Sequence, residues 1–222
     1  MTNALPKIAV IGGTGALGSG LAFKWAGNGY PVIIGSRSSE KGEAAAAALR
    51  ERVPSASVTG TGNQEAASEA DIVVLTVPYA HHGATIAQIK DVVSGKIVVD
   101  TTVPLVPPKV ARVQLSADWP IAGTTQAKLG ESVSVVSAFH NVAATHLQDG
   151  GEHDDSDVLV YGNSNDARET VIGLVEAAGL RGWHAGSIDN SVVSEALTSV
   201  LIFINKKYKI NGAGIKIIGD PA

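Results

Sequence analysis

The chain has 222 residues, no cysteine and a formal net charge of −4. This length suits one domain, or one domain with a small appendage, and the absence of cysteine excludes a disulfide scaffold, a zinc ribbon, an iron–sulfur protein and a thiol nucleophile. The negative charge and the 5% aromatic content argue against nucleic acid binding, and the short apolar runs and the absence of a secretory pattern at 1–7 lead us to expect a cytoplasmic protein.

Strand and helix patterns alternate through the first hundred residues. Apolar strand patterns occupy 7–11, 31–34, 57–60, 72–77 and 96–99. Helical patterns lie between them at 17–25, 43–49, 63–70 and 84–93, the third with Asn63 as its expected cap. This alternation predicts right-handed βαβ units on a parallel sheet that has helices on both faces. We therefore predict the α/β class, with a Rossmann-type doubly wound parallel sheet.

The pattern changes after residue 100. Three prolines exclude regular structure from 101–108, and a short helix at 123–130 and a strand at 133–139 follow. Beyond the acidic loop 148–157, a strand, a helix and a strand are expected at 158–162, 166–178 and 182–185, and then an apolar helix at 188–208. We therefore divide the chain into a Rossmann domain, 1–140, and a small C-terminal α/β domain, 141–222. The last helix is so apolar that it must pack within that domain or against another subunit.

The strongest motif joins the first strand to the first helix. Residues 8–18 read IAVIGGTGALG, which places Gly13, Gly15 and Gly18 in the spacing GxGxxG. Glycines in this turn leave room for a pyrophosphate, and the helix start offers free N–H groups and a partial positive charge to its oxygens. We expect cofactor contacts along the whole turn, at Gly13, Thr14, Gly15, Ala16, Leu17 and Gly18.

The end of the second strand indicates which dinucleotide binds. Chains that bind NAD usually place an Asp or Glu there, about 20 residues after the glycines, for the ribose hydroxyl. This chain instead has Ser36, Arg37 and Lys41, a hydroxyl and two cations that suit a 2′-phosphate. The sequence therefore predicts NADP(H) rather than NAD(H).

Two later segments supply candidate polar groups. Pro78 ends the fourth strand, and His81, His82 or Tyr79 in the following loop could lie along the cofactor or could simply be solvated. His140, with Asn141, follows the sixth strand at the expected crevice, although a strand-end histidine without a role fits the pattern as well.

Other chemistry is sparse in the sequence. The run 152–155 could offer metal ligands, but consecutive residues rarely share one geometry, and we expect no metal site. The chain lacks HExxH, GxSxG and a Tyr followed four residues later by Lys, so no residue is predicted with certainty to be catalytic. Hydride transfer between two stacked cofactors needs alignment and a dry site more than an acid or base.

Six segments together resemble one known family. They are Ile11–Gly18, Gly35–Arg37 with Lys41, Val74–Pro78, Thr102–Pro104, Val136–His140, and Asn211–Gly212 with Gly214–Lys216. In order and spacing the chain resembles the NADPH-dependent reductases of coenzyme F-420, also called F-420:NADP oxidoreductases.

The resemblance implies a homodimeric oxidoreductase that transfers a hydride between the nicotinamide of NADP(H) and the deazaflavin of coenzyme F-420. It implies NADP(H) contacts at Thr14–Leu17, Ser36, Arg37 and Lys41. Nearer the nicotinamide or the deazaflavin it implies contacts at Val77, Pro78, His81, Val103, Ala138, His140, Val142 and Ala144, with His140 positioning the deazaflavin.

Alternatives remain at this point. The chain could reduce a small imine or a 2-oxo acid with NADPH, or it could be a non-catalytic NADP(H) sensor. The lysines at 206, 207, 209 and 216 could meet the acidic tail of the deazaflavin or form a solvated surface. The direction of the reaction, the hydride face and the degree of preference for NADP stay open.

Overall fold

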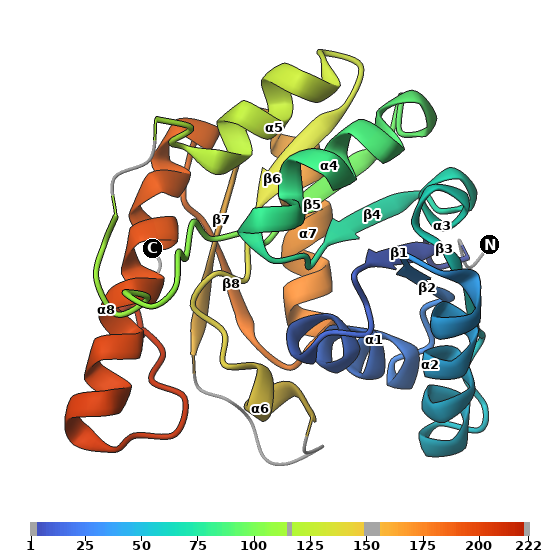
Figure 1. The fold of residues 1–222 in the computed structure, drawn as a ribbon, viewed down its shortest axis with the longest axis horizontal. Helices are drawn as coiled ribbons and strands as arrows, with labels where there is room; N and C mark the ends of the chain where they lie inside the picture. The colour runs from blue at the N-terminus through green and yellow to red at the C-terminus, as the bar shows by residue number, and fades with distance from the viewer. Residues whose placement is uncertain (1–3, 115–116, 149–155, 220–222) are drawn as a thin grey trace.

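The fold is built on one sheet, seen in a computed structural model that describes residues 4–114, 117–148 and 156–219. The sheet has eight strands in the order β3-β2-β1-β4-β5-β6-β7-β8 (Figure 1). The strands are β1 (Ile8–Ile11), β2 (Val32–Ser36), β3 (Val58–Gly62), β4 (Ile72–Leu75), β5 (Ile97–Asp100), β6 (Ser134–Ser137), β7 (Asp157–Gly162) and β8 (Arg181–His184). Neighbouring strands are parallel, except that β7 runs antiparallel to β6.

Helices cover both faces of this sheet. They are α1 (Ala16–Gly27), α2 (Ser39–Arg52), α3 (Asn63–Glu69), α4 (Tyr79–Ile89), α5 (Ile121–Leu129), α6 (Ala144–Gln148), α7 (Asn165–Ala177) and α8 (Val192–Tyr208), with 3₁₀ turns η1 (Lys90–Val92) and η2 (Ile188–Ser191). Side chains of a strand alternate between faces, so Ile8 and Val10 share a core with α1, α2 and α7, while Ala9 and Ile11 share one with α3, α4 and α5. The predicted doubly wound α/β fold is confirmed.

The first six strands have the order 3-2-1-4-5-6, which is the order of dinucleotide-binding folds. The chain moves outward from β1 to β2 and β3, and then crosses back to β4 on the other side of β1. Ligands of such sheets bind at the carboxyl ends of the strands, beside this reversal. The fold thus indicates where the site lies before any side chain is considered.

The C-terminal part of the chain extends the same sheet. Val136 and Ser137 of β6 pair with Gly162 and Tyr161 of β7, across the boundary expected at 140. Helix α8 is tied to α5 by Glu195, whose carboxylate accepts the N–H groups of Ile121 and Ala122 at 2.9 and 3.3 Å. The division into 1–140 and 141–222 therefore stays a prediction.

Several local expectations need correction. Helix α4 begins at Tyr79 rather than at 84, so His81 and His82 lie on a helix and not in a loop. Gly62, not Asn63, is the N-cap of α3, and Asn63 is the first helical residue. Helix α6 was not expected, because five residues are too short to show a helical period. The acidic run 152–155 lies outside the described residues.

The described helices include none that is long and apolar enough to cross a membrane.

Candidate active site

Hydrogen bonding of the parallel strands places the predicted site segments along one edge of the sheet. One residue from each of the five adjacent strands β2, β1, β4, β5 and β6 lies in a single row, in the order Gly35, Ile11, Leu75, Asp100 and Ser137. The next residue of each strand opens a segment at the carboxyl edge. The glycine turn, Ser36–Arg37, the segment after β4, the segment after β5 and the segment that holds His140 therefore share this edge, although they are far apart in the sequence.

The glycine turn presents unpaired backbone N–H groups at this edge. Gly12 has φ +80°, which favours glycine, and the Gly15 N–H donates to the Gly12 carbonyl at 2.9 Å. Helix α1 then starts without a side-chain cap. The N–H groups at the start of a helix have no partner within it, and Thr14, Gly15 and Ala16 are exposed here, so the turn is open to an anion.

Two glycines of this turn are required by packing. A Cβ atom on Gly13 would lie 2.8 Å from the Val10 carbonyl oxygen, and a Cβ on Gly18 would lie 2.5 Å from the Thr76 hydroxyl oxygen. Thr76 follows β4 and donates to the Ile11 carbonyl at 2.9 Å. Helix α1 therefore presses against the ends of β1 and β4, which fixes its N-terminus at the crevice.

The predicted 2′-phosphate residues follow β2. Ser36 is buried at the strand end, while Arg37 and Lys41 are exposed. Within the described part of the chain, neither cation forms an ion pair with a carboxylate. Ser38 caps α2 by accepting the Lys41 N–H at 3.3 Å. The start of α2 thus offers two unneutralised cations beside a buried hydroxyl, a combination that suits a phosphate.

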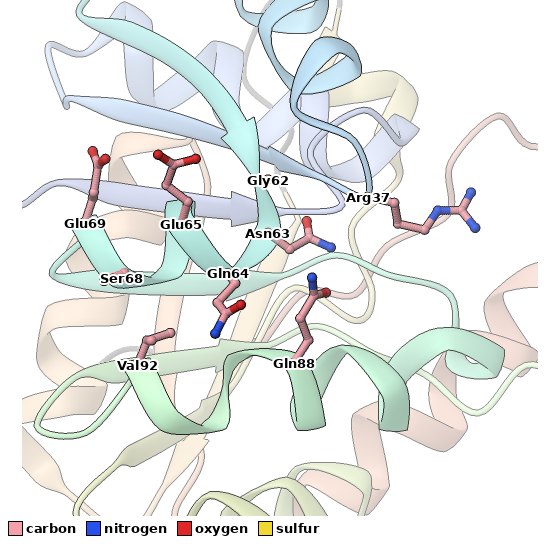
Figure 2. Close-up of a pocket in the computed structure, with 9 residues that line it drawn as sticks. All are labelled: Arg37, Gly62, Asn63, Gln64, Glu65, Ser68, Glu69, Gln88 and Val92. Carbon is pink, nitrogen blue, oxygen red and sulfur yellow. The ribbon is translucent and has the colours of Figure 1, made fainter.

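A cavity of about 550 Å³ adjoins Arg37. Its lining is Arg37, Gly62, Asn63, Gln64, Glu65, Ser68, Glu69, Gln88 and Val92. Figure 2 shows Arg37 at one end, the carboxylates of Glu65 and Glu69 at the other, and the amides of Asn63 and Gln88 between α3 and α4. Asn63 is only 3% exposed, and its Oδ1 has no hydrogen-bond partner. Sequence reasoning gave Asn63 only a capping role, and nothing but its position after β3 could have indicated more.

The segment after β4 differs from its predicted form. Val77 is half-buried, Pro78 precedes α4, and His81 lies exposed on the first turn of that helix. His82 points the other way: it is 4% exposed, and its Nε2 lies 2.8 Å from Asp100 Oδ2. The structure therefore separates the two histidines, leaving His81 near the crevice and His82 below it.

Asp100 is the most connected acid of the edge, and it was not among the predicted residues. Its Oδ2 also accepts the Thr125 hydroxyl at 2.6 Å, and its Oδ1 accepts the Thr102 N–H at 3.0 Å. Burial by itself raises the pKa of Asp100, but the hydrogen bond and the charge of His82, with the two further hydrogen bonds, hold that pKa below its usual value. The signal available in the sequence was an Asp directly after three apolar strand residues.

His140 lies in a buried turn after β6. Its Nε2 is 3.3 Å from the Ser137 hydroxyl oxygen, and its Nδ1 has no partner. Burial lowers the pKa of His140 to about 4, and the nearby negative charge of Asp100 opposes this only in part. The imidazole is therefore neutral near pH 7, and it offers one nitrogen to a ligand without bringing a charge.

The remaining predicted residues are small and apolar. Val103 is half-buried after β5, Ala138 is buried after β6, and Val142 donates its N–H to the Phe139 carbonyl at 3.4 Å. Ala144 begins α6, which packs against α1. Side chains of this kind exclude water and leave a flat ring system room to stack.

Polar atoms without partners gather at the same edge. Thr102 Oγ1, His140 Nδ1 and Asn141 Oδ1 are buried and form no hydrogen bond. Buried polar groups are almost always paired, so three such atoms after the adjacent strands β5 and β6 point to a ligand with polar edges. The site supplies binding groups and a dry wall rather than an acid–base pair. The described residues contain no cluster of three or more possible metal ligands.

The comparisons with known proteins agree with this site. The sequence model of the family described as "NADP oxidoreductase coenzyme F420-dependent" matches residues 7–104. The chain is 42% identical to the "F420-dependent NADP reductase" of Methanocaldococcus jannaschii, over 95% of this chain and 97% of that protein. It is 37% identical to the protein of the same name from Methanothermobacter thermautotrophicus, over 97% and 96% of the two chains. The chain belongs to the family of coenzyme F-420-dependent NADP reductases.

Solved structures support the assignment of this chain to the reductase family. A crystal structure from Arthrobacter sp. FB24, described provisionally as an F420-dependent NADP reductase, has a TM-score of 0.79 and 25% identity, and the match covers 96% of this chain and 100% of that one. An imine reductase from Myxococcus stipitatus has a TM-score of 0.59 and 19% identity, over 92% of this chain and 62% of that one, which shows a shared fold alone. The family expected from six short segments is confirmed.

Proposed function

We propose that this reductase transfers a hydride reversibly between NADP(H) and the deazaflavin coenzyme F-420, as an 8-hydroxy-5-deazaflavin:NADP oxidoreductase. The observation that carries the proposal is the single edge of the sheet on which the glycine turn, the two unneutralised cations and the buried, partnerless polar atoms all lie. The names of the full-length relatives support the same reaction.

In this proposal the phosphates of NADP(H) bind at two segments, the glycine turn after β1 and the cationic segment after β2. Backbone N–H groups of the turn 14–18, other than the Gly15 N–H that donates to Gly12, hold the pyrophosphate, and Ser36, Arg37 and Lys41 hold the 2′-phosphate. The adenine then enters the cavity next to Arg37, where the amides of Asn63 and Gln88 offer both donors and acceptors. The glycines that would clash with a Cβ, and the unpaired Asn63 oxygen, fit this placement.

The reacting rings lie further along the edge. Val77, Pro78, His81, Val103 and Ala144 face the nicotinamide, while Ala138, His140 and Val142 face the deazaflavin. When both are bound, the chemistry is direct hydride transfer between nicotinamide C4 and deazaflavin C5. The residues of the chain hold the two rings parallel, exclude water through their apolar side chains, and pair the polar ring edges through His140. Reduction of the deazaflavin also takes up one proton, which comes from solvent at the open edge of the site, so no side chain is assigned to move it.

The test is a stopped-flow assay with NADPH and oxidised coenzyme F-420, in which loss of the visible deazaflavin absorbance is followed. We expect rapid loss with NADPH and much slower loss with NADH. Tight NADPH binding without any loss of absorbance would overturn the proposal. Turnover of a cyclic imine or a 2-oxo acid would then favour a small-molecule reductase, and no turnover at all would favour an NADP(H) sensor.

The homodimer also remains a proposal. Helix α8 exposes Val193, Val200 and Phe203, of which Phe203 is 55% exposed, and an apolar helix face of this kind suits a second copy of the chain. Light scattering on the purified protein tests this, with Phe203→Glu expected to shift a dimer toward monomer.

A cytoplasmic location fits a chain without cysteine, and it is proposed on that ground.

A further inference from the structure

A buried pair of ionisable side chains lies beneath the nicotinamide end of the crevice. His82 and Asp100 are 4% and 1% exposed, and Nε2 of the histidine lies 2.8 Å from Oδ2 of the aspartate. The Thr125 hydroxyl lies 2.6 Å from the same carboxylate oxygen and 3.2 Å from the imidazole nitrogen. The group therefore links α4, the end of β5 and α5.

The pair fixes backbone that borders the crevice. Oδ1 of Asp100 holds the Thr102 N–H at 3.0 Å, and the Thr101 hydroxyl donates to the Leu75 carbonyl at 2.8 Å. The segment after β5, which carries Val103, is thereby tied to β4. On the other side, His82 lies one helical turn after Pro78, so its bond to Asp100 also sets how α4 starts.

Stability alone gives little reason for such a pair. Moving both partners out of water costs about as much as their attraction returns, and well-packed apolar side chains often serve a fold equally well. The rest of this face of the sheet is packed by such side chains, among them Ile86, Ile89 and Val98. A hydrogen-bonded pair differs from them by fixing direction, because its bonds hold particular atoms at particular angles.

We infer that His82 and Asp100 are positioning residues for hydride transfer. Neither touches a substrate. They hold the segments 77–78 and 102–103 at the spacing that the nicotinamide requires against the second ring, and Thr125 completes the group. The inference rests on the proposed function above, and it goes beyond it by assigning a role in the reaction to residues that bind no cofactor.

The His82–Asp100 pair lies away from the segments that are proposed to bind the phosphates of NADP(H). The pyrophosphate and the 2′-phosphate are assigned to segments after β1 and β2, whereas the pair acts on segments after β4 and β5. Disturbing the pair should therefore leave the binding of NADP⁺ nearly intact while the alignment of the rings is lost. A misplacement of about 1 Å is enough to slow a reaction about a hundredfold.

The experiment measures single-turnover hydride transfer at saturating NADPH and coenzyme F-420, alongside the Kd for NADP⁺ and the melting temperature. We expect His82→Leu to slow the transfer by at least about tenfold, while the Kd for NADP⁺ changes by less than about threefold. His82→Gln keeps a hydrogen-bond donor, so it should retain more of the rate. The double variant His82→Leu/Asp100→Asn should recover part of it, because the second change removes an unpaired buried charge.

A matched control sits at the other end of the same strand. Lys96 precedes β5 and donates to the carbonyls of Ala67 and Ser68 at 2.8 and 2.6 Å, so Lys96→Met removes one part-buried and one exposed hydrogen bond far from the crevice. It should lower the melting temperature without slowing the transfer. If His82→Leu does not fold, Thr125→Val removes one donor to Asp100 and carries the same expectation with a smaller effect.

Two results would overturn the inference: a transfer rate in the folded His82 and Thr125 variants equal to that of wild type, or a rise in the Kd for NADP⁺ as large as the loss of rate. Failure of the proposed function is a different result. In that case the wild-type protein itself fails to bleach coenzyme F-420, and the positioning role falls with it.

Discussion

Gly18 lies so close to Thr76 that a Cβ atom on the glycine would sit 2.5 Å from the threonine hydroxyl oxygen. The same Cβ would lie 2.8 Å from the Cα of Gly13. Helix α1 can therefore approach the ends of β1 and β4 only because residue 18 has no side chain. This contact places the N-terminus of the helix, where the pyrophosphate is proposed to bind.

Gly18→Ala should accordingly weaken NADPH binding by at least about tenfold and destabilise the fold by about 1–3 kcal/mol, because the helix must shift outward. Gly27→Ala is the matched control, since a Cβ there meets nothing within 4 Å. Alanine at the end of the same helix should be neutral or stabilising by about 0.5–1 kcal/mol. Fluorescence titration and thermal unfolding measure both effects. Equal NADPH affinity in the two variants would contradict the packing argument.

Selectivity for the 2′-phosphate should depend on Arg37 and Lys41. A hydrogen bond to a charged group contributes about 1.5–3 kcal/mol, so each alanine variant should raise the KM for NADPH by about 10- to 100-fold and leave the KM for NADH nearly unchanged. Arg50→Ala is the control, because Arg50 lies on α2 with Lys41 but pairs with Glu43 at 2.5 Å. An equal loss for both nucleotides would place the 2′-phosphate elsewhere.

Acid should destabilise the protein through His140. Its pKa falls from 6.5 in the unfolded chain to about 4 in the folded one, so between these values the unfolded chain binds more protons. The free energy of unfolding therefore decreases as the pH falls from about 6.5 toward 4, by roughly 3 kcal/mol for a shift of this size.

Two other buried acids also affect how the free energy of unfolding depends on pH. The lowered pKa of Asp100 contributes stability that is lost as the pH falls below its unfolded value of 3.8, whereas burial raises the pKa of Glu195, an effect of opposite sign. The test is therefore the difference between wild type and His140→Gln in urea unfolding at pH 7.5 and pH 4.5. The variant should lose less stability on acidification, and parallel losses would show that His140 is not the group responsible.

The lysines near the C-terminus provide a prediction about the second substrate. Lys206, Lys207 and Lys209 are exposed at and just after the end of α8, and Lys216 is exposed in the segment that follows. Replacing all four with Gln should raise the KM for coenzyme F-420 and weaken its dependence on salt, because the acidic tail loses its attraction. The KM for NADPH is the internal control. Unchanged affinity for coenzyme F-420 would show that these lysines form only a solvated surface.

Local signals in the sequence were sufficient for the order of the elements. Strand 7–11, the glycines that follow it and the helix after them were predicted because apolar periodicity and glycine spacing act over neighbouring residues. Helix α4 shows the limit of such signals. Its start at Tyr79 carries two histidines and no apolar repeat, so the pattern became visible only near 84.

The C-terminal arrangement was harder to predict for another reason. The sequence indicated a strand, a helix and a strand after 158, but it did not indicate that β7 would join β6 antiparallel and continue the first sheet. Strand pairing between distant segments depends on how the whole chain packs. The same reason applies to Glu195, which caps α5 from α8 across a separation of more than seventy residues.

Sequence patterns were sufficient to predict the doubly wound fold, the glycine turn, the cations after the second strand and the family, because each of these depends on residues that are close together or on their order along the chain. The folded structure was needed to show that His82 turns inward to Asp100 while His81 stays at the surface, and that Asn63, Thr102 and Asn141 keep unpaired oxygens. Burial and the pairing of polar atoms are properties of the folded surroundings, and segments after different strands supply those surroundings only once the sheet has formed.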